Sequence, residues 1–533
     1  MTSNAATPGD GRALRPLPGF TDTSFRWFCF AVGAGMSLLA VGGRWDIALA
    51  AWFAPVFILR FMRDSSLPVG LVLAWLVSVA GSICWAMQLG IPLELSWLIS
   101  LAYGTVFALP FFADRLLTPR LGIVGRLFIF PAAFASVEWI MGTFSPLGTS
   151  SGLRAITQTE NLPLLQFVAV AGPYSIGFLI NWLATTVNLL WEQPASHLVR
   201  KATAVYTVVL LLVLFGGAAR LSFTAPPAEY VRMAGVTPSM RVQEQARAMI
   251  ERQPVKHRPV ADPDVMKAST GLFANKEELE RTDPAIARAA HGLVHDDLLV
   301  ATREAARAGA KVVIWSETAA SVQRAEDMPS LLAKVGEVAR EENIFVNVAV
   351  GEPFARNQTY LVGPGGKALW AYDKNYPVPV LEPVAPRSSP IPVAQTPFGR
   401  LSNVICFDGD FPALNRVNAD IMIIPGFDWP EVGRMHTLKA ARLRAIENGY
   451  GLIRVAYHSQ SAAFDRLGNV LATQDTTGPE RHIMYADVPA RGSRTLYNRT
   501  GDILGWLSLA GLLAGIAAAL FRRRTASRAQ RGP

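Results

Sequence analysis

Three residues of reactive type each follow a short apolar run in the second half of this 533-residue chain. Glu317 follows KVVIWS, Lys374 follows ALWAYD, and Cys406 follows LSNVI. A thiol becomes a nucleophile when a base removes its proton, and a carboxylate in a dry pocket can act as that base. The oxyanion formed next needs a fixed positive donor, which a lysine ammonium supplies. The order Glu, Lys, Cys therefore predicts nucleophilic catalysis at Cys406.

Each of these residues also has a purely structural interpretation. A free Cys is most often a small buried hydrophobe, and a Glu–Lys ion pair beside it needs no chemistry. The combination favours catalysis, because all three residues stand at the ends of apolar runs, where α/β sheets place their ligands. Phe411 and Pro412 then predict the start of a helix, since Pro suits a first helical turn. The N-terminus of such a helix favours a nearby thiolate or oxyanion.

Residues 225–495 carry the elements that would position these side chains. Strands are predicted at 231–236, 312–315, 344–350, 359–362, 368–373, 401–405, 421–424, 451–455 and 483–488. Helices are predicted at 283–308, 329–341 and 435–447. This alternation predicts a mixed α/β sheet covered by helices. The charged stretch 240–282 is predicted to be irregular, either as a mobile arm or as a plain surface insertion.

The rest of the chain is too apolar for an ordinary soluble protein. Hydrophobic residues make up 51% of the chain and charged residues only 17%, a balance that indicates a membrane protein. Eight apolar segments are long enough, or nearly so, to span a bilayer: 25–43, 46–61, 68–91, 96–113, 122–142, 163–190, 203–221 and 503–521. The first apolar stretch starts late and many others follow, so no cleavable signal peptide is expected.

Basic residues mark one side of the predicted membrane. With eight spans, one side collects Arg12, Arg15, Arg60, Arg63, Arg115, Arg120, Arg200, Lys201 and the arginines at 522–524. By the positive-inside rule this side is the cytoplasm, and the polar block 225–495 then lies outside. Arg44 and Arg154 are isolated exceptions. The net charge of +9 has this topological explanation, and no basic stripe with interleaved aromatic residues indicates nucleic-acid binding.

The pattern divides the chain into five regions. These are a disordered cytoplasmic tail at 1–24, a seven-helix transmembrane domain at 25–222, an extracytoplasmic catalytic domain at 225–495, a final transmembrane helix at 503–521, and a basic cytoplasmic tail at 522–533. Besides Cys406, the chain has Cys29 and Cys84, which lie in apolar segments and are predicted to pack there. No Cys/His spacing typical of a metal site occurs.

Several stretches around the three reactive residues resemble a known family. WSET, YDKNYPVPVLEP and ICFDGDFP resemble the Glu, Lys and Cys blocks of the nitrilase superfamily. Within it the chain is most similar to the membrane-bound apolipoprotein N-acyltransferases, because GFDWP, ARLRAIENG, SAAFDRLG and LYNRTGD follow their carboxyl half. The resemblance covers residues 25–521. It implies a membrane α-helical bundle of about eight spans plus a nitrilase-type α-β-β-α sandwich.

The resemblance also implies roles for the reactive residues. Cys406 would attack an acyl ester of a phospholipid, Glu317 would take the thiol proton, and Lys374 would stabilise the oxyanion. Glu382 matches a second Glu of the family motif and would orient Lys374 and the base; a loop carboxylate without a role is the alternative. His436 is interpreted as a helix residue that supports the wall of the site, and Arg442 is interpreted in the same way.

Four places depart from the family pattern. Asp408 stands where the acyltransferases have Glu, and the shorter carboxylate is still expected to hydrogen-bond the site. Phe407 stands where they usually have Tyr, so a phenolic hydroxyl is missing. The block 232–237, which ends in Thr237, lacks the Gln and Asn of a Q-G-N pattern, and 143–153 departs from a Pro-Trp pattern. These positions concern the substrate entrance more than the triad, and they leave the exact donor and acceptor open.

The implied activity is apolipoprotein N-acyl transfer, without metal or organic cofactor. An acyl chain would pass from a phospholipid, through a Cys thioester, to the N-terminal amine of a diacylglyceryl-Cys lipoprotein. The expected enzyme is a monomer in the bacterial inner membrane, in contact with membrane lipids, and its catalytic domain faces the periplasm. Two alternatives remain open: a membrane-tethered carbon–nitrogen hydrolase (amidase), in which water resolves the thioester, and a non-catalytic lipid- or lipoprotein-binding protein with an idle triad.

The predicted orientation can be tested with reporter fusions. A reporter that is active only in the periplasm should be active when fused after Ala225, because the polar block is predicted to lie outside. The same reporter should be silent when fused after Arg524, which follows the last predicted span. The opposite pattern of activity would reverse the assigned orientation.

Overall fold

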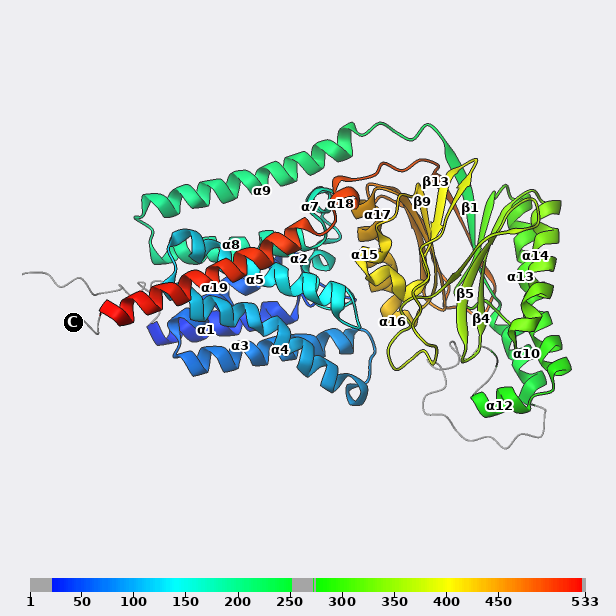
Figure 1. Cartoon of the computed structure of the whole chain (residues 1–533), viewed down its shortest axis with the longest axis horizontal. Helices are drawn as coiled ribbons and strands as arrows, with labels where there is room; N and C mark the ends of the chain where they lie inside the picture. The colour runs from blue at the N-terminus through cyan, green and yellow to red at the C-terminus, as the bar shows by residue number, and fades with distance from the viewer. Residues whose placement is uncertain (1–21, 252–271, 273–274, 530–533) are drawn as a thin grey trace, which may run out of the picture.

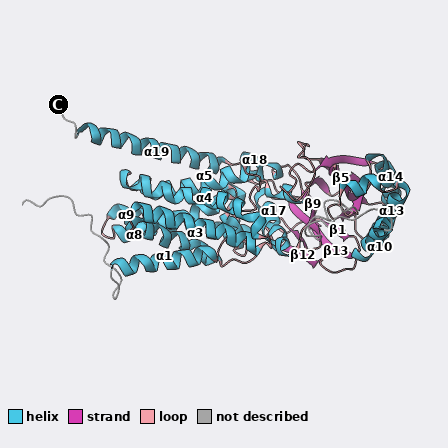
Figure 2. Ribbon diagram, turned by 90° about the horizontal axis from the view of Figure 1, so that it is seen from below, coloured by secondary structure: helices cyan, strands magenta, loops and turns pink. Residues whose placement is uncertain are grey.

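The computed structural model describes residues 22–251, 272 and 275–529 of the chain (Figure 1). It consists of two parts that lie end to end: a bundle of long helices, and a pair of sheets with helices outside them (Figures 1 and 2). Most of the predicted tail 1–24, the middle of the stretch 240–282 and the end of the tail 522–533 lie outside the described residues. The described parts of these three stretches contain helices, whose bounds are given below.

Every one of the eight predicted apolar segments folds into helix. The long helices are α1 (Asp22–Leu38), α2 (Ala48–Asp64), α3 (Leu67–Gln88), α4 (Leu93–Leu117), α5 (Ile123–Phe144), α8 (Tyr174–Glu192), α9 (His197–Phe223) and α19 (Ile503–Ala529). Within the described residues, α3, α4, α5, α9 and α19 are long and apolar enough to cross a bilayer, and a sixth span results if one bent pair is counted. Helices α1 and α2 have 17 residues each, so each is about 25 Å long against a hydrocarbon core of about 30 Å. The membrane-bundle class is confirmed, with five to six candidate spans where about eight were expected.

The segment predicted as one span at 163–190 is sharply bent. Two short helices, α6 (Leu162–Leu165) and α7 (Val168–Ala171), precede α8, and the axis turns by 113° between the two halves. Gly172 and Pro173 form the bend. Gly172 has a φ of +82°, and a Cβ there would lie 2.6 Å from the Tyr497 ring, so the close approach requires glycine. The segment predicted as one span is therefore two helical pieces joined at a bend.

Charged side chains tie the helices together at the end of the bundle away from the sheets. The Arg63 guanidinium donates to the Asp114 carboxylate on α4 (2.7 Å) and to Glu192 on α8 (3.1 Å). Arg60 on α2 and Arg126 on α5 also form ion pairs with Glu192. Burial of such charges is tolerated only when they are paired. Arg60 and Arg63 belong to the basic cluster that predicts the cytoplasmic side.

The second part of the molecule contains one seven-stranded sheet and one six-stranded sheet. The first has the order β13-β1-β2-β4-β5-β6, with β3 beside β4. Its strands are β1 (Tyr230–Thr237), β2 (Val312–Trp315), β3 (Ala320–Ser321), β4 (Phe345–Glu352), β5 (Arg356–Val362), β6 (Ala368–Asp373) and β13 (His482–Pro489). The second has the order β12-β11-β10-β9-β8-β7. Its strands are β7 (Val393–Thr396), β8 (Gly399–Asn403), β9 (Ile421–Phe427), β10 (Gly451–Tyr457), β11 (Gln460–Phe464) and β12 (Val470–Asp475).

The two sheets pack face to face and helices cover both outer faces. The inner layer is apolar, as Ile314 of the first sheet and Ile423 and Ile453 of the second share one core. Helices α10 (Met240–Glu251), α13 (Pro284–Arg307) and α14 (Met328–Glu341) cover the first sheet (Figure 1). The short helices α15 (Pro412–Asn415), α16 (Pro430–Gly433) and α17 (Arg442–Asn448) lie outside the second sheet, on the side of the bundle (Figure 1). This arrangement confirms the predicted α-β-β-α sandwich.

Some predicted elements differ in extent from the observed ones. The helix predicted to start at Pro412 is a single turn, because it ends at Asn415. The helix predicted at 435–447 begins as a π-helix over Arg434–Ala441 and becomes α-helical only at α17. The stretch 240–282, predicted as irregular, contains α10 and a second short helix, α12 (Lys276–Arg281).

Polar side chains join the outer helical layer of the second sheet to the bundle. Lys439 of the π-helix donates to the Asp46 carboxylate (2.6 Å) and to the Gly43 carbonyl (2.8 Å). Lys439 is buried, and the side chain of Asp46 is only 4% exposed. The Trp429 indole N–H donates to the Leu89 carbonyl at 2.6 Å. These contacts reach the α1–α2 loop and the end of α3, so they hold the sandwich against one end of the bundle.

The Lys439–Asp46 pair should contribute strongly to stability. Lys439→Ala leaves the Asp46 carboxylate buried without its cation, which costs on the order of 3 kcal/mol. We expect a thermal unfolding midpoint several degrees lower for the purified protein in detergent. Lys334→Ala is the control, because the Lys334–Asp296 pair lies on the exposed surface and such pairs contribute about 0–1 kcal/mol. Equal midpoints for Lys439→Ala and the wild type would contradict the assigned contribution.

Candidate active site

Cys406 lies in a tight, strained turn at the end of β8. The chain passes from the strand into one short 3-10 helix, Cys406–Asp410, and Cys406 adopts a φ of +44°. A non-glycine residue in this region costs about 1–3 kcal/mol and persists only when its surroundings hold it. The turn aims the thiol into the space between the two sheets, where Cys406 is 3% exposed.

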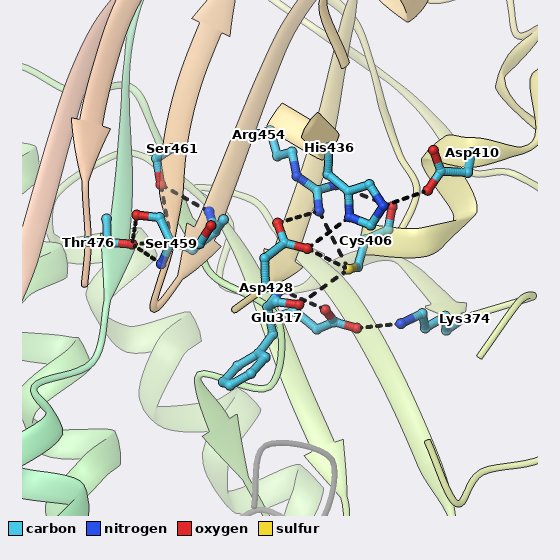
Figure 3. Close-up of polar contacts among 12 residues, drawn as sticks. Glu317, Lys374, Cys406, Asp410, Asp428, His436, Arg454, Ser459, Ser461 and Thr476 are labelled. Atoms are coloured by element: carbon cyan, nitrogen blue, oxygen red, sulfur yellow. Dashed lines mark hydrogen bonds and ion pairs between the residues drawn. The ribbon is translucent and has the colours of Figure 1, made fainter. Parts of the chain in front are cut away.

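Glu317 and Lys374 reach the same space from the other sheet. Glu317 follows β2 and Lys374 follows β6, as the sequence predicts. The Lys374 ammonium donates to Glu317 Oε1 at 2.7 Å and forms a second, closer ion pair with Glu382. Figure 3 shows the Glu317, Lys374 and Cys406 side chains converging. The structure therefore brings together the three residues that were proposed as the triad, with Glu382 beside them.

Both oxygens of Glu317 are held in place. Oε1 accepts from Lys374 and from the Asn357 side-chain amide at 2.7 Å. Oε2 accepts from the backbone N–H of Phe427 at 2.8 Å, and the Phe427 carbonyl accepts from the Cys406 thiol at 3.6 Å. The carboxylate is thus fixed beside the thiol through a residue that contacts both of them.

The protonation states suit a nucleophile and its oxyanion donor. Burial alone would lower the pKa of Lys374, but Glu317, Glu382 and Cys406 hold it well above its ordinary value, so the side chain stays an ammonium. Burial, and then the Glu317 charge, raise the pKa of the Cys406 thiol well above its ordinary value. Burial also raises the pKa of Glu382. A thiol of this kind reacts only when a base takes its proton during attack.

Asp408 connects the Cys406 turn to the strand end that carries Lys374. Its carboxylate accepts from the backbone N–H groups of Ile405 (3.1 Å) and Tyr376 (2.8 Å), and from the Tyr372 hydroxyl (2.8 Å). Asp408 is fully buried, and burial raises its pKa to about 7. The shorter carboxylate at this position hydrogen-bonds the site, as expected from the sequence.

The other three positions that depart from the family pattern are Phe407, the stretch 143–153 and the block 232–237. The block 232–237 lies in β1, and the other two lie at the Cys406 turn. Phe407 is buried and packs edge-to-face against Phe411, with 5.6 Å between ring centroids. The stretch 143–153 touches the end of the Cys406 turn: both the N–H and the hydroxyl of Thr149 donate to the Asp410 carbonyl, at 2.8 and 2.7 Å. Gly148 allows this approach, because its φ is +53° and a Cβ there would lie 2.6 Å from that carbonyl oxygen.

Four further charged residues surround the thiol on its other side. Arg454 on β10 lies 3.5 Å from Cys406 Sγ and 2.8 Å from the Asp428 carboxylate. His436 lies 3.0 Å from Asp428 and 3.3 Å from Asp410 (Figure 3). Sequence reasoning missed Arg454 and Asp428, although both stand at or just beyond predicted strands, and it gave His436 a wall position only. Arg442, the other predicted wall residue, donates to the Thr159 carbonyl at 3.0 Å, which is a contact with the bundle.

A pocket opens beside Glu317 and Glu382. Its remaining lining is mostly apolar, from Val378, Leu381, Val384, Phe427 and Trp429, with Arg356 and Asn357 at its wall. Trp429 also contacts the end of α3 through its indole N–H. The pocket therefore borders the helical bundle, and its mostly apolar lining with a few polar groups is typical of a ligand pocket.

Comparison with known proteins accounts for both parts of the chain. The carbon-nitrogen hydrolase family matches residues 288–496, and the apolipoprotein N-acyltransferase N-terminal domain matches residues 33–186. The chain belongs to the apolipoprotein N-acyltransferase family. This family is a membrane-bound branch of the nitrilase superfamily, and its members are acyltransferases.

Individual relatives cover almost the whole chain. An apolipoprotein N-acyltransferase from Geobacter metallireducens is 24% identical over 97% of this chain and 99% of its own length. Another, from Bradyrhizobium diazoefficiens, is 24% identical over 86% of this chain and 81% of its own. A solved amidase from Nesterenkonia sp. aligns with 52% of this chain and 96% of its own, at 16% identity and a TM-score of 0.36.

Asp408 offers a direct test of how the acyltransferase site is held together. Asp408→Asn places an amide N–H₂ among groups that are themselves donors, so at least one buried hydrogen bond is lost, at about 1–3 kcal/mol. We expect acyl transfer at least tenfold slower, and a lower unfolding midpoint. Tyr372→Phe removes a single bond to Asp408 and should have a smaller effect. Asp475→Asn, on an exposed edge strand, is the control. A fully active Asp408→Asn variant would show that the turn does not need this carboxylate.

Proposed function

We propose that this membrane acyltransferase moves an acyl chain from a phospholipid to the N-terminal amine of a diacylglyceryl-Cys lipoprotein. The observation that carries the proposal is the convergence of Cys406, Glu317 and Lys374 inside a sandwich that sits on an apolar helical bundle. A soluble amide hydrolase has no need of such a bundle, whereas a lipid substrate reaches the site from the bilayer. The basic cluster at the far end of the bundle supports an inner-membrane location with the sandwich facing the periplasm.

In the first half-reaction, Cys406 Sγ attacks the ester carbonyl carbon of the phospholipid. Glu317 takes the thiol proton as the S–C bond forms, and Lys374 donates to the oxyanion together with the N–H of Phe407. One such donor contributes about 3 kcal/mol to the transition state. The ester C–O bond then breaks, and Glu317 returns its proton to the departing lysophospholipid oxygen. A thioester on Cys406 remains.

In the second half-reaction, the lipoprotein amine attacks the thioester carbonyl. Glu317 accepts a proton from the attacking nitrogen, the C–S bond breaks, and the proton returns to the Cys406 sulfur. The amide product leaves and the resting thiol is restored. The two substrates therefore use the same pocket in turn, as in other ping-pong enzymes. Glu382 keeps the Lys374 ammonium in place through both steps.

The covalent intermediate gives the decisive test. Wild-type protein purified from membranes without a lipoprotein acceptor should carry an acyl adduct on Cys406, measurable by intact and peptide mass. Hydroxylamine at neutral pH should release the adduct, since it cleaves thioesters faster than oxygen esters. A diacylglyceryl-Cys peptide should discharge the adduct as an amide. Cys406→Ser and Cys406→Ala should abolish both the adduct and transfer, because the hydroxyl has a far higher pKa than the thiol and alanine has no nucleophile.

Cys84→Ala is the matched control for these variants. Cys84 is a free cysteine on α3, and its replacement should leave the Cys406 adduct and acyl transfer unchanged. Discharge by water as fast as by the peptide would favour the carbon–nitrogen hydrolase alternative. The absence of any adduct on Cys406 under turnover conditions would remove covalent catalysis at this residue.

A further inference from the structure

The thiol of Cys406 faces a second cation that the triad does not include. Arg454 comes from β10, the strand two positions from β8 in the same sheet, and is 2% exposed. Its Nη2 lies 3.5 Å from Cys406 Sγ, and its Nη1 donates to the Cys406 carbonyl at 3.3 Å. In Figure 3 Arg454 lies on one side of the sulfur, while Lys374 and Glu317 lie on the other. The guanidinium thus contacts both the side-chain sulfur and the backbone carbonyl of Cys406.

The guanidinium is held in this position by Asp428. Arg454 Nη2 donates to Asp428 Oδ2 at 2.8 Å, while Asp428 Oδ1 lies 3.9 Å from Sγ. Burial alone would raise the pKa of Asp428, but Arg454 and His436 hold it well below its ordinary value. Asp428 is therefore a poor base for the thiol, and its charge opposes a thiolate. An Arg–Asp pair alone would offer the sulfur little net positive charge.

His436 changes that balance. Its Nδ1 lies 3.0 Å from Asp428 and its Nε2 3.3 Å from Asp410. Burial alone would lower the pKa of His436, but Asp410 and Asp428 raise it above its ordinary value. These two carboxylates therefore favour the imidazolium form, whose positive charge offsets the charge of Asp428. Counting outward from the sulfur, the charges alternate in sign: Arg454, Asp428, His436 and Asp410.

We propose that Arg454 stabilises the Cys406 thiolate directly, and that Asp428 and His436 are positioning residues that hold the guanidinium against the sulfur. The inference rests on the proposed thioester route and adds a residue to it. A thiolate forms twice in that route, once as the attacking group and once as the group expelled by the lipoprotein amine. Lys374 is committed to Glu317 and Glu382 and to the oxyanion. Arg454, as a separate cation at the sulfur, assists both steps while Lys374 keeps its place beside Glu317 and Glu382.

The pH dependence of Cys406 alkylation tests the inference without either substrate. The full-length protein in detergent is treated with hydroxylamine to free the thiol, and then with iodoacetamide over a range of pH, followed by the mass of the Cys406 peptide. An opposite charge within about 4–6 Å changes a pKa by about 1–3 pH units. Because Arg454 is also paired with Asp428, its effect on the Cys406 thiol is expected at the lower end of this range. Arg454→Gln should therefore raise the alkylation midpoint by about one pH unit, which is a tenfold slower reaction at any pH below the midpoint. Arg454→Lys keeps the charge and should stay near the wild-type midpoint.

Two further variants make the outcome decisive. Asp428→Asn keeps an oxygen that can accept from Arg454 but removes a negative charge near the sulfur, so it should lower the midpoint, the opposite direction from Arg454→Gln. Arg400→Gln, on β8 but paired with Asp420 away from the thiol, should not change it. Equal midpoints for folded Arg454→Gln and the wild type would overturn the inference, as would equal upward shifts for Arg454→Gln and Arg454→Lys. If Arg454→Gln does not fold, an unchanged or raised midpoint in Asp428→Asn overturns it. A shifted midpoint without any thioester would instead count against the proposed function alone.

Discussion

The burial of the Lys374 ammonium is the constraint on which the site depends. A buried charge is tolerated only when it is paired and hydrogen-bonded, and Lys374 meets this requirement through Glu317 and Glu382. The two carboxylates in turn need the ammonium, because they share a dry pocket. Glu317 and Lys374 come from the ends of different strands of one sheet, so their pairing fixes how those strand ends face each other. The pairing of these strand ends in the native sheet therefore also places half of the site.

Cys406, the proposed nucleophile, comes from the opposite sheet, and two polar links bring it into register with Glu317 and Lys374. The Asp408 carboxylate holds the Cys406 turn against the strand end that carries Lys374, and the Phe427 backbone links Cys406 to Glu317. These links surround the turn in which Cys406 adopts its positive φ, and such strain persists only where the surroundings hold it. The sandwich thus positions its reactive groups by joining two sheets across their shared apolar core.

How much could be predicted from the sequence depended on where each residue stands. Glu317, Lys374 and Cys406 follow apolar runs of strand length, so their place at strand ends was readable. Arg454 lies inside such a run and Asp428 sits just beyond another, and nothing in one sequence shows that these strands lie side by side. Edge strands were also missed: β7 and β12 read VAQT and VLATQD, and such partly exposed, polar runs lack the apolar signal. The bend at Gly172 was missed because hydropathy is averaged over a whole segment.

The short length of α1 and α2 leaves open whether they cross the bilayer, and this affects only whether two crossings are counted or none. The two helices are joined by a short loop and lie side by side, so they form a hairpin that enters and returns. If both helices cross the bilayer, the hairpin contributes two crossings. If both stop short, it contributes none, and the total number of crossings changes by two. Every later segment keeps the same orientation in either case. The side on which the sandwich lies is therefore decided by the helices that flank it, α9 and α19, and a change in the depth of the first hairpin leaves it where it is.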